Sequence, residues 1–332
     1  MKSLRTIIFF PPVKNITGGM QVLLQIAGQL RELDHEACFY LWEKGHAGFL
    51  ENLGFDVFTG NKIKLESDDV FLVPEGWPNV LSQGINSGTR CMIYCQNWAY
   101  LFSGLPEGVS WQDLPVEFLA VSDPVRVFIE KSLGKSSLII RPFIDKEIFY
   151  PPARKPCRPV NIAYMPRKNR GLYKQIRQVF ESRNRSMNEI NWVCIEGLSL
   201  DKVADKLRKS HVFLATGFPE GLGLPCIEAM ACGCLVTGFA GFGGWDYMRQ
   251  VNIGGYMPRF PLCPVPWKGN GYFSADGDVL DAALNLERAV KLCLRPDETL
   301  SGILENSLLT AGYYSKKNQK KEILAWQGNS FR

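Results

Sequence analysis

The sequence predicts an α/β protein with two domains, each built on an open parallel sheet. Short apolar runs alternate with amphipathic stretches, which is the pattern of βαβ units. The length of 332 residues suits two domains of roughly 150 residues better than one core. The alternation is interrupted by a proline-rich stretch and then restarts, which indicates a domain boundary.

The first half contains strands separated by helices or loops. Apolar runs predict strands over 4–10, 37–41, 70–73, 90–94, 117–121 and 137–140. Apolar residues at helical spacing predict a helix over 20–33, directly after Gly18 and Gly19. A helix over 124–132 can be capped by Ser122 or Asp123 and has Pro124 in its first turn. We assign 1–145 to the first domain and the proline-rich 146–159 to a linker.

The second half repeats this rhythm over residues 160–314. Strands are predicted over 160–164, 191–195, 211–215, 234–237 and 254–257. Helices are predicted over 172–181, 200–209, 224–231, 247–251, 276–294, 297–314 and 316–326. Ligands of such sheets bind at the carboxyl ends of the strands. Two Rossmann-like domains placed face to face would therefore hold a ligand in the cleft between them.

Composition narrows the class of protein further. With 46% hydrophobic and 21% charged residues, the chain has the make-up of an ordinary globular protein rather than a disordered one. No apolar run approaches the ~20 residues of a membrane-spanning helix, and no secretion signal is present, so we expect a cytoplasmic protein. The cysteines and the three histidines lack the spacing of zinc ligands, which predicts reduced thiols and no metal site.

Basic residues are clustered, although the net charge is only +5. One cluster contains Arg167, Lys168 and Arg170, and another contains four lysines between 316 and 321. Solvated helix faces explain most such clusters. The functional alternatives are phosphate groups or an anionic membrane surface.

The most informative segment covers 218–233 and follows a predicted strand. Gly221 and Gly223 allow the backbone to approach a ligand, and Pro225 suits the first turn of the helix that follows. The free amides at the start of that helix can hold a diphosphate. Glu220 and Glu228 flank these amides, and carboxylates accept hydrogen bonds from hydroxyl groups. The segment therefore predicts a ligand that carries both phosphates and sugar hydroxyls.

The string from 219 to 233, P-E-G-L-G-L-P-C-I-E-A-M-A-C-G, closely resembles the Glu-x7-Glu signature of family 4 retaining glycosyltransferases of the GT-B fold. Weaker similarities follow in order along the chain. They comprise the glycine loop at 18–19, the run L-R-E-L-D-H-E-A at 30–37, Val121-Ser122, and the 139–149 segment with Asp145 four residues before Phe149.

The resemblance implies a role for each matching residue. Glu228 would bind the ribose hydroxyls and Glu220 would contact the transferred sugar. The backbone at Gly221, Gly223 and Leu224 would hold the diphosphate, and the loop with Gly18 and Gly19 would contact donor phosphates and acceptor.

The family also places two cations after the first strand of the second domain, where they reach the diphosphate. Arg167 is the match for the first, and either Lys168 or Arg170 for the second. Cations aimed at a departing diphosphate stabilise the transition state more than the ground state. We therefore group Arg167 with Glu220 as catalytic.

The sequence departs from the family where several members have a histidine after a strand of the first domain. Gln96, Asn97 and Trp98 stand there, and these are candidate contacts of sugar or acceptor. A glutamine at this place resembles the subgroup that includes rhamnosyltransferases. Asp246, after the glycines at 241–244, occupies the place of an acid that often follows a Gly-Gly turn in the family.

The resemblance implies transfer of a hexose or deoxyhexose from a nucleotide-diphosphate sugar to a glycan or lipid-linked acceptor, as in lipopolysaccharide or other surface-polysaccharide synthesis. No cofactor and no metal are expected, and no nucleic acid. The final helix over 315–332 would pack back on the first domain or contact anionic lipid at the inner face of the membrane. The alternatives are a nucleotide-sugar-binding protein or epimerase of the same fold, and a phosphorylase. An NAD-dependent dehydrogenase is disfavoured because G-x-G-x-x-G is missing after the first strand.

Overall fold

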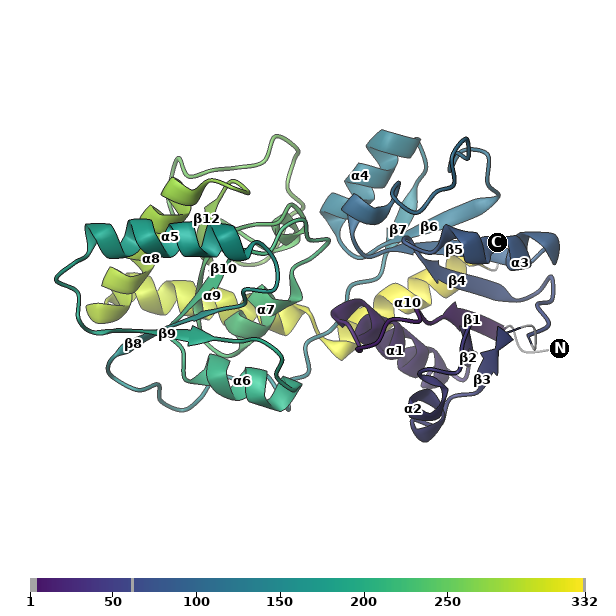
Figure 1. Cartoon of the computed structure of the whole chain (residues 1–332), viewed down its shortest axis with the longest axis horizontal. Coiled ribbons are helices and arrows are strands. Elements are labelled where there is room, and N and C mark those ends of the chain that lie inside the picture. Colours follow the sequence, from purple (N-terminus) through teal and green to yellow (C-terminus); the bar gives the residue numbers. More distant parts are fainter. Residues whose placement is uncertain (1–4, 61–62, 331–332) are drawn as a thin grey trace. The chain divides into compact units, whose positions relative to one another are not determined.

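The computed structural model describes residues 5–60 and 63–330, apart from the side chains of 329 and 330. Leu4, at the start of the first predicted strand, and residues 331–332 lie outside the described residues. The chain forms two compact units (Figure 1). Unit 1 comprises Met1–Pro142 and Lys317–Arg332, and unit 2 comprises Phe143–Lys316. The expected linker over 146–159 thus clusters with unit 2.

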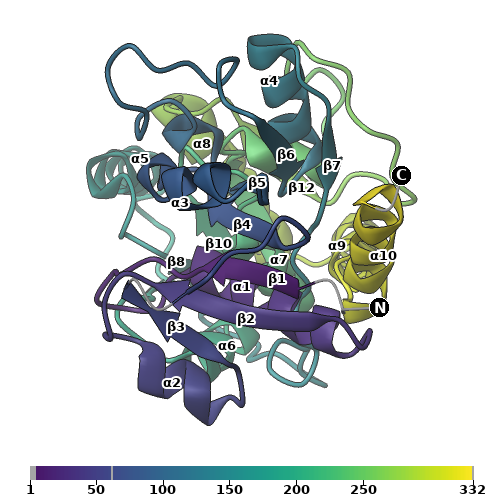
Figure 2. The same cartoon turned by 90° about the vertical axis from the view of Figure 1, so that its right-hand side faces the viewer.

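Unit 1 contains a seven-stranded parallel sheet with the order β3-β2-β1-β4-β5-β6-β7 (Figure 2). Its strands are β1 (Arg5–Phe9), β2 (Glu36–Leu41), β3 (Val57–Thr59), β4 (Val70–Pro74), β5 (Arg90–Cys95), β6 (Val116–Ala120) and β7 (Ser137–Ile139). The strand order reverses direction between β1 and β4, which makes the carboxyl ends of these two strands the place where a ligand is expected.

Two of the helices of unit 1, α1 and α4, begin at a side-chain cap that the sequence provides. They are α1 (Gly18–Arg31), α2 (Ala47–Asn52), α3 (Leu81–Asn86) and α4 (Asp123–Leu133). The Thr17 hydroxyl accepts a hydrogen bond from the Met20 amide at the start of α1. Of the two predicted caps of α4, Ser122 takes the role and accepts from the Val125 amide at 3.4 Å. Gly134 ends α4 with φ of +65°, a conformation that favours glycine.

The last helix, α10 (Lys316–Ser330), belongs to unit 1 from residue 317 onward. Ile323 and Trp326 are buried, whereas Leu324 is 48% exposed. The Glu322 carboxylate accepts from the backbone amide of Arg141 at 2.7 Å and from its Nη1 at 2.6 Å. The helix therefore completes the core of a unit whose other elements come from the beginning of the chain.

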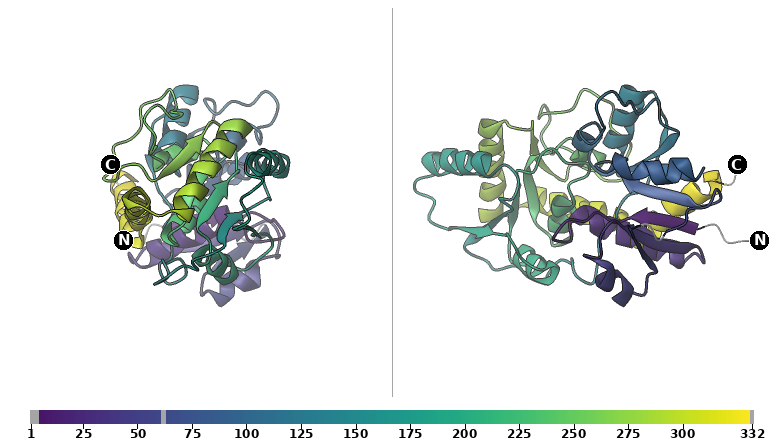
Figure 3. Two further views of the ribbon diagram at one scale, coloured as in Figure 1. Left: turned by 90° about the vertical axis from the view of Figure 1, so that its left-hand side faces the viewer. Right: turned by 45° about the vertical axis from the view of Figure 1, so that its right-hand side comes forward.

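Unit 2 contains a five-stranded parallel sheet with the order β12-β11-β10-β8-β9. Its strands are β8 (Val160–Tyr164), β9 (Ile190–Cys194), β10 (Val212–Ala215), β11 (Leu235–Phe239) and β12 (Gly271–Ser274). Its helices are α5 (Arg170–Arg183), α6 (Leu200–Arg208), α7 (Leu224–Ala231), α8 (Val279–Leu294) and α9 (Glu298–Tyr313). Helix α8 crosses one face of the sheet beside α5 (Figure 3, left). Here the strand order reverses between β8 and β10.

Two predicted elements of unit 2 are wrong. The helix expected over 247–251 is replaced by a short 3-10 turn at Gly243–Asp246, and residues 254–257 form no strand. Tyr256 and Met257 are exposed, so the apolar letters of that segment do not mark a core strand. Strands β3 and β12 were not predicted. Strand β3 is a three-residue, half-buried edge strand, and β12 begins with a glycine and ends with a serine.

Replacing Trp326 by alanine tests the role of α10 in unit 1. Removal of a buried indole is expected to lower the free energy of unfolding by about 3 kcal/mol or more. Leu324→Ala, on the exposed side of the same helix, should cost under about 0.5 kcal/mol. Urea unfolding followed by fluorescence and circular dichroism measures both. Equal losses in the two variants would contradict the packing of this helix.

Candidate functional site

A pocket of about 70 Å³ lies at the carboxyl ends of β8 and β10, where the strand order of unit 2 reverses. Its lining includes three of the predicted site residues with charged side chains and one of the predicted glycines. The lining residues are Met165, Arg167, Lys168, Phe213, Leu214, Ala215, Thr216, Gly217, Glu220, Gly223, Pro225, Cys226, Phe239 and Ala240. The structure thus brings together Arg167, Lys168, Glu220 and Gly223.

The pocket adjoins the amino terminus of α7. Gly223 caps this helix with φ of +85°, a backbone conformation that a larger residue adopts only with strain. Its carbonyl accepts a hydrogen bond from the Tyr247 hydroxyl at 2.9 Å, which fixes the turn. Pro225 stands in the first turn, where a missing N–H has no cost. The remaining amides and the helix dipole favour an anion at this end. Leu224 is the first residue of α7, and Gly221, in the loop just before the helix, is buried.

The loops after β8 and β10 are tied together at the pocket. Lys168 Nζ lies 2.8 Å from Glu220 Oε1 and donates to the Pro219 carbonyl at 2.8 Å. Asn169 Nδ2 donates to the carbonyls of Thr216 and Phe218 at 2.9 Å each. These contacts hold a cation and a carboxylate side by side at the mouth of α7. Asn169 has no counterpart among the predicted site residues, because only the fold places it there.

The two other cations of this loop lie in different surroundings. Arg167 is exposed and lines the pocket, and no hydrogen bond or ion pair of its guanidinium exists within the described part of the chain. Arg170 begins α5, is exposed and pairs with Glu196 at 2.5 Å. It does not line the pocket. Of these two cations, Lys168 is therefore the one that the structure places at the pocket beside α7.

Glu228 lies one turn inside α7 and is half-buried. Burial raises the pKa of its carboxyl to about 7. Within residues 5–60 and 63–330, its side chain has no hydrogen-bond or ion-pair partner. A carboxylate without a partner can accept two hydrogen bonds from a diol, which is the chemistry expected of a ribose contact.

Thr216 is a lining residue that the sequence analysis missed. It follows β10 directly and is 2% exposed. Its hydroxyl oxygen is buried and has no hydrogen-bond partner among the residues that the structure describes. A buried hydroxyl without a partner costs free energy unless a ligand or water satisfies it. No pattern in the sequence distinguishes this threonine from a core residue.

The corresponding switch point of unit 1 brings together Gly19, Gln96 and an acid that was not predicted, Glu75. Gly19 lies in the first turn of α1, beside Gly18, and a Cβ atom at Gly19 would lie 2.7 Å from Gln96 Oε1. The buried Glu75 carboxylate accepts from the amides of Gln96 at 2.9 Å and Asn97 at 2.8 Å. Burial raises the pKa of Glu75 to about 7, and these amides act in the opposite direction.

The two other candidates of this loop are engaged in packing. Asn97 is 8% exposed, and its Oδ1 accepts from the Ala99 amide at 3.1 Å, which caps a short turn. The ring of Trp98 lies 5.4 Å from that of Phe128 on α4. Gln96 is thus the side chain of this loop that adjoins the glycines at the start of α1.

Asp246 lies apart from the residues that line the pocket. It is 2% exposed, and its carboxylate accepts a hydrogen bond from the Tyr314 hydroxyl. These contacts give Asp246 a structural role in unit 2, where it links the turn after β11 to the end of α9.

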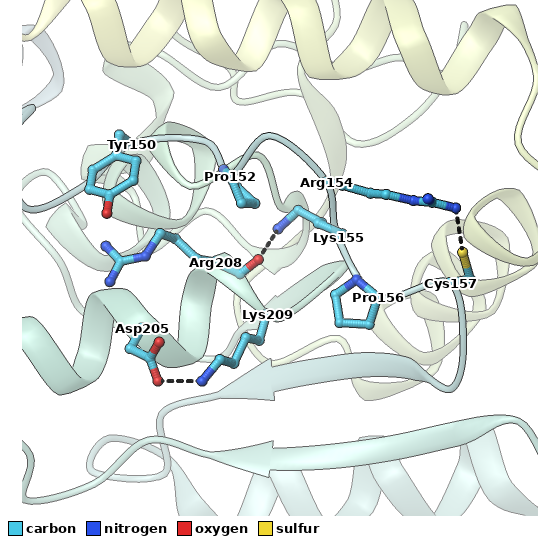
Figure 4. Close-up of a pocket in the computed structure, with 9 residues that line it drawn as sticks. All are labelled: Tyr150, Pro152, Arg154, Lys155, Pro156, Cys157, Asp205, Arg208 and Lys209. Carbon is cyan, nitrogen blue, oxygen red and sulfur yellow. Dashed lines mark hydrogen bonds and ion pairs between the residues drawn. The ribbon is translucent and has the colours of Figure 1, made fainter.

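A larger cavity of unit 2, about 600 Å³, is basic but has a different character (Figure 4). Lys155 Nζ donates to the Cys232 carbonyl at 2.9 Å and to the carbonyls that end α6. Lys209 pairs with Asp205 at 2.8 Å, and Arg208 donates to the Ile148 carbonyl at 2.7 Å. Most of these cations are therefore occupied by protein oxygens. The cavity also adjoins the amino ends of β8 and β10, the edge of the sheet opposite the pocket beside α7.

No group of three or more metal-ligating His, Cys, Asp or Glu residues occurs in the described ranges 5–60 and 63–330. Over the same ranges, no helix has the length and apolar character needed to cross a membrane.

Comparisons with known proteins agree with this architecture. No protein-family model matches the sequence. The chain is 28% identical over 232 residues to an alpha-1,6-glucosyltransferase of Actinobacillus pleuropneumoniae serotype 7. The matched region covers 68% of this chain and 70% of the relative.

Solved structures share the fold at low sequence identity. A glycosyltransferase from Rickettsia africae has a TM-score of 0.71 at 12% identity, over 100% of both chains. The lipopolysaccharide outer core galactosyltransferase WaaB reaches 0.66 at 12% identity, over 98% of this chain and 100% of that one. The pneumococcal O-GlcNAc transferase GtfA, solved with UDP and GlcNAc, reaches 0.63 at 11% identity, over 99% of both chains.

The expected fold class is confirmed: the chain has the α/β architecture of GT-B glycosyltransferases, with two parallel sheets. The sequence similarity to a glucosyltransferase, together with this fold, supports a glycosyltransferase function.

The contrast between Glu228 and Glu75 gives a pH-dependent prediction. Each has a pKa near 7, above the usual 4.5, so the folded protein binds more protons than the unfolded chain between about pH 5 and pH 8. The contribution of each group to stability therefore rises as the pH falls through that window. Glu228→Gln removes an unpaired, half-buried charge and should raise the melting temperature at pH 8, with little change at pH 5.

Glu75→Gln serves as the matched variant. The substitution replaces one carboxylate oxygen of Glu75 by a side-chain NH2 group, which then faces the backbone amide of Gln96 or Asn97. One of these amides loses its acceptor, so the melting temperature should fall at pH 8. Differential scanning calorimetry at both pH values measures the two shifts. Shifts of the same sign at pH 8 would show that the two carboxylates do not differ as described.

Proposed function

We propose that the protein is a retaining glycosyltransferase that moves a sugar from a nucleotide-diphosphate donor to a glycan or lipid-linked acceptor in surface-polysaccharide synthesis. The observation that carries the proposal is the pairing of Lys168 with Glu220 at the amino terminus of α7, in a pocket that Arg167 also lines. Amide donors, cations and a carboxylate together match a ligand with phosphates and sugar hydroxyls.

In this proposal the diphosphate binds at the amino terminus of α7, next to Gly223 and Leu224. The unpaired carboxylate of Glu228 accepts hydrogen bonds from the ribose hydroxyls. Glu220 lies at the same helix end and accepts hydrogen bonds from the transferred sugar. Its side chain is 24% exposed, so a ligand can reach it.

The leaving diphosphate gains negative charge as the glycosidic bond breaks. Arg167 and Lys168 stabilise this charge because both line the pocket at the helix terminus, where Glu220 and the Pro219 carbonyl hold Lys168 in place before the reaction begins. These groups take over the work of a divalent cation, so we propose that transfer needs no metal and no cofactor. With donor and acceptor on the same face, the diphosphate oxygen accepts the acceptor proton and the anomeric configuration is retained.

We assign the acceptor to unit 1, where Gly18 and Gly19 adjoin Gln96. The planar amide of Gln96 offers a donor and an acceptor to sugar hydroxyls. Lys316, Lys317 and Lys321 of α10 are exposed, which fits a peripheral contact with an anionic membrane surface that carries a lipid-linked acceptor. A cytoplasmic location follows from the use of a nucleotide-activated donor.

A donor panel tests the proposal. Purified protein is screened by thermal shift with UDP, GDP and dTDP, and then with UDP-glucose and dTDP-rhamnose, because the curated relative is a glucosyltransferase and the Gln96 position resembles rhamnosyltransferases. One of the nucleotides should raise the melting temperature. With the matching nucleotide sugar and an acceptor, the enzyme should then release that nucleotide, and it should do so even when EDTA has removed divalent cations. Binding without turnover on any acceptor would favour a nucleotide-sugar-binding protein, and no binding would refute the donor site.

Variants of Glu220, Lys168 and Arg170 test the site. Glu220→Gln should reduce turnover by roughly 100-fold or more because the lost contact is made in the transition state, with the protein still folded. Lys168→Met should weaken binding of the nucleoside diphosphate by about tenfold or more. Arg170→Met is the matched control and should stay within about twofold of wild type, because its partner Glu196 lies on the surface. A larger effect of Arg170→Met than of Lys168→Met would reverse the assignment.

A further inference from the structure

The turn after β11 carries backbone strain beside Glu220. Phe242 has φ of +67° and ψ of −60°, and the Gly243 amide donates to the Gly241 carbonyl at 2.9 Å across it, so this residue is the centre of a strained γ-turn. Gly241, with φ of +65°, precedes it. Such strain persists only where neighbouring contacts hold it, and it is frequent at functional sites.

This turn is hydrogen-bonded to the backbone of Glu220 on both sides. The Glu220 amide donates to the Gly241 carbonyl at 2.9 Å, and the Gly243 amide donates to the Glu220 carbonyl at 3.0 Å. A Cβ atom at Gly243 would lie 2.1 Å from the backbone of Gly221, so the two loops are in direct contact. The position of Glu220 is therefore set by the turn after β11 as well as by Lys168.

One side chain holds the turn from the other side. Asp276, in the loop after β12, accepts from the Gly241 amide through Oδ1 at 2.7 Å. The backbone amide of Phe242 also faces the Asp276 carboxylate and lowers its pKa. Burial raises the pKa of Asp276, the Gly241 amide opposes this shift, and the nearby charge of Glu220 adds to it. An acid that contacts the turn close to a second acid is retained here at an electrostatic cost.

We infer that Asp276 is a positioning residue for Glu220, acting through the strained turn that its carboxylate holds. The inference rests on the proposed role of Glu220 in contacting the transferred sugar. Asp276 contacts the backbone of the turn, and this backbone is hydrogen-bonded to both the amide and the carbonyl of Glu220. Without the acceptor, the Gly241 amide loses its partner and the strained γ-turn at Phe242 can relax, which moves the carboxylate of Glu220 away from its place at α7.

Asp278, two residues further along, provides a matched control. Its side chain accepts from the Asp281 amide at 3.0 Å and caps α8, so its role is confined to that helix. Asp278→Ala should destabilise unit 2 through the lost cap without loosening the turn. Asp276→Asn keeps an acceptor for the Gly241 amide, whereas Asp276→Ala removes it.

Hydrogen exchange of the purified variants tests positioning without any substrate. Asp276→Ala should increase exchange by about tenfold or more in peptides that cover 218–222 and 240–244, because their hydrogen bonds open more often. Asp276→Asn and Asp278→Ala should stay close to wild type in both peptides. Wild-type protection of residues 218–222 in folded Asp276→Ala would overturn the inference. If Asp276→Ala fails to fold, Asp276→Ser takes its place, because its shorter side chain also withdraws the acceptor from the Gly241 amide, and Asp278→Ser is its control. Wild-type protection of residues 218–222 in Asp276→Ser would then overturn the inference.

Turnover separates this inference from the proposed function. With UDP as the binding probe and UDP-glucose as the donor, Asp276→Ala should lower kcat on the order of 10–100-fold while the Kd for UDP stays within about twofold. Asp278→Ala should leave kcat unchanged. A Kd that rises together with the loss of kcat would indicate a general structural role and contradict positioning. If wild type neither binds UDP nor turns over UDP-glucose, the donor proposal fails for that donor, and the exchange data still decide on Asp276.

Discussion

The ion pair between Lys168 and Glu220 is the contact on which the pocket of unit 2 depends. It joins the loop after β8 to the loop after β10, and these strands meet where the strand order reverses. Asn169 reinforces the connection with two hydrogen bonds to carbonyls of the second loop. A parallel sheet places both loops at one edge, so residues about fifty positions apart form one site without a dedicated structural element.

Two acids with the same raised pKa have opposite relations to the protein around them. Glu75 gives both its oxygens to backbone amides and thereby fixes the loop that carries Gln96. Glu228 has no such partner within the described residues and retains its capacity to accept hydrogen bonds. A raised pKa alone therefore does not distinguish a structural acid from a binding acid. The hydrogen-bond partners make the distinction.

Much of the fold could be predicted from the sequence because strands buried on both faces are continuous apolar runs, as in β4 and β10. The short edge strand β3 and the glycine-led β12 lack that signal. The 218–233 string identified Glu220 and Gly223 as pocket residues, and the basic cluster after the first strand of unit 2 identified Arg167 and Lys168. Glu75, Asn169 and Asp276 could not be found in this way, because each acquires its role from a contact with another segment of the chain. Thr216 could not be found either, because only the fold shows that its buried hydroxyl lines the pocket without a partner.

The crossing of the chain at α10 affects the order in which the units can be completed. Unit 2 is continuous in sequence, whereas the core of unit 1 includes Ile323 and Trp326 from the end of the chain. During synthesis, the first unit to emerge from the ribosome therefore remains without part of its core until the second has been made. An interrupted translation product would contain an intact unit 2 next to an unfinished sheet domain, a species that chaperones and proteases can recognise by its exposed apolar surface.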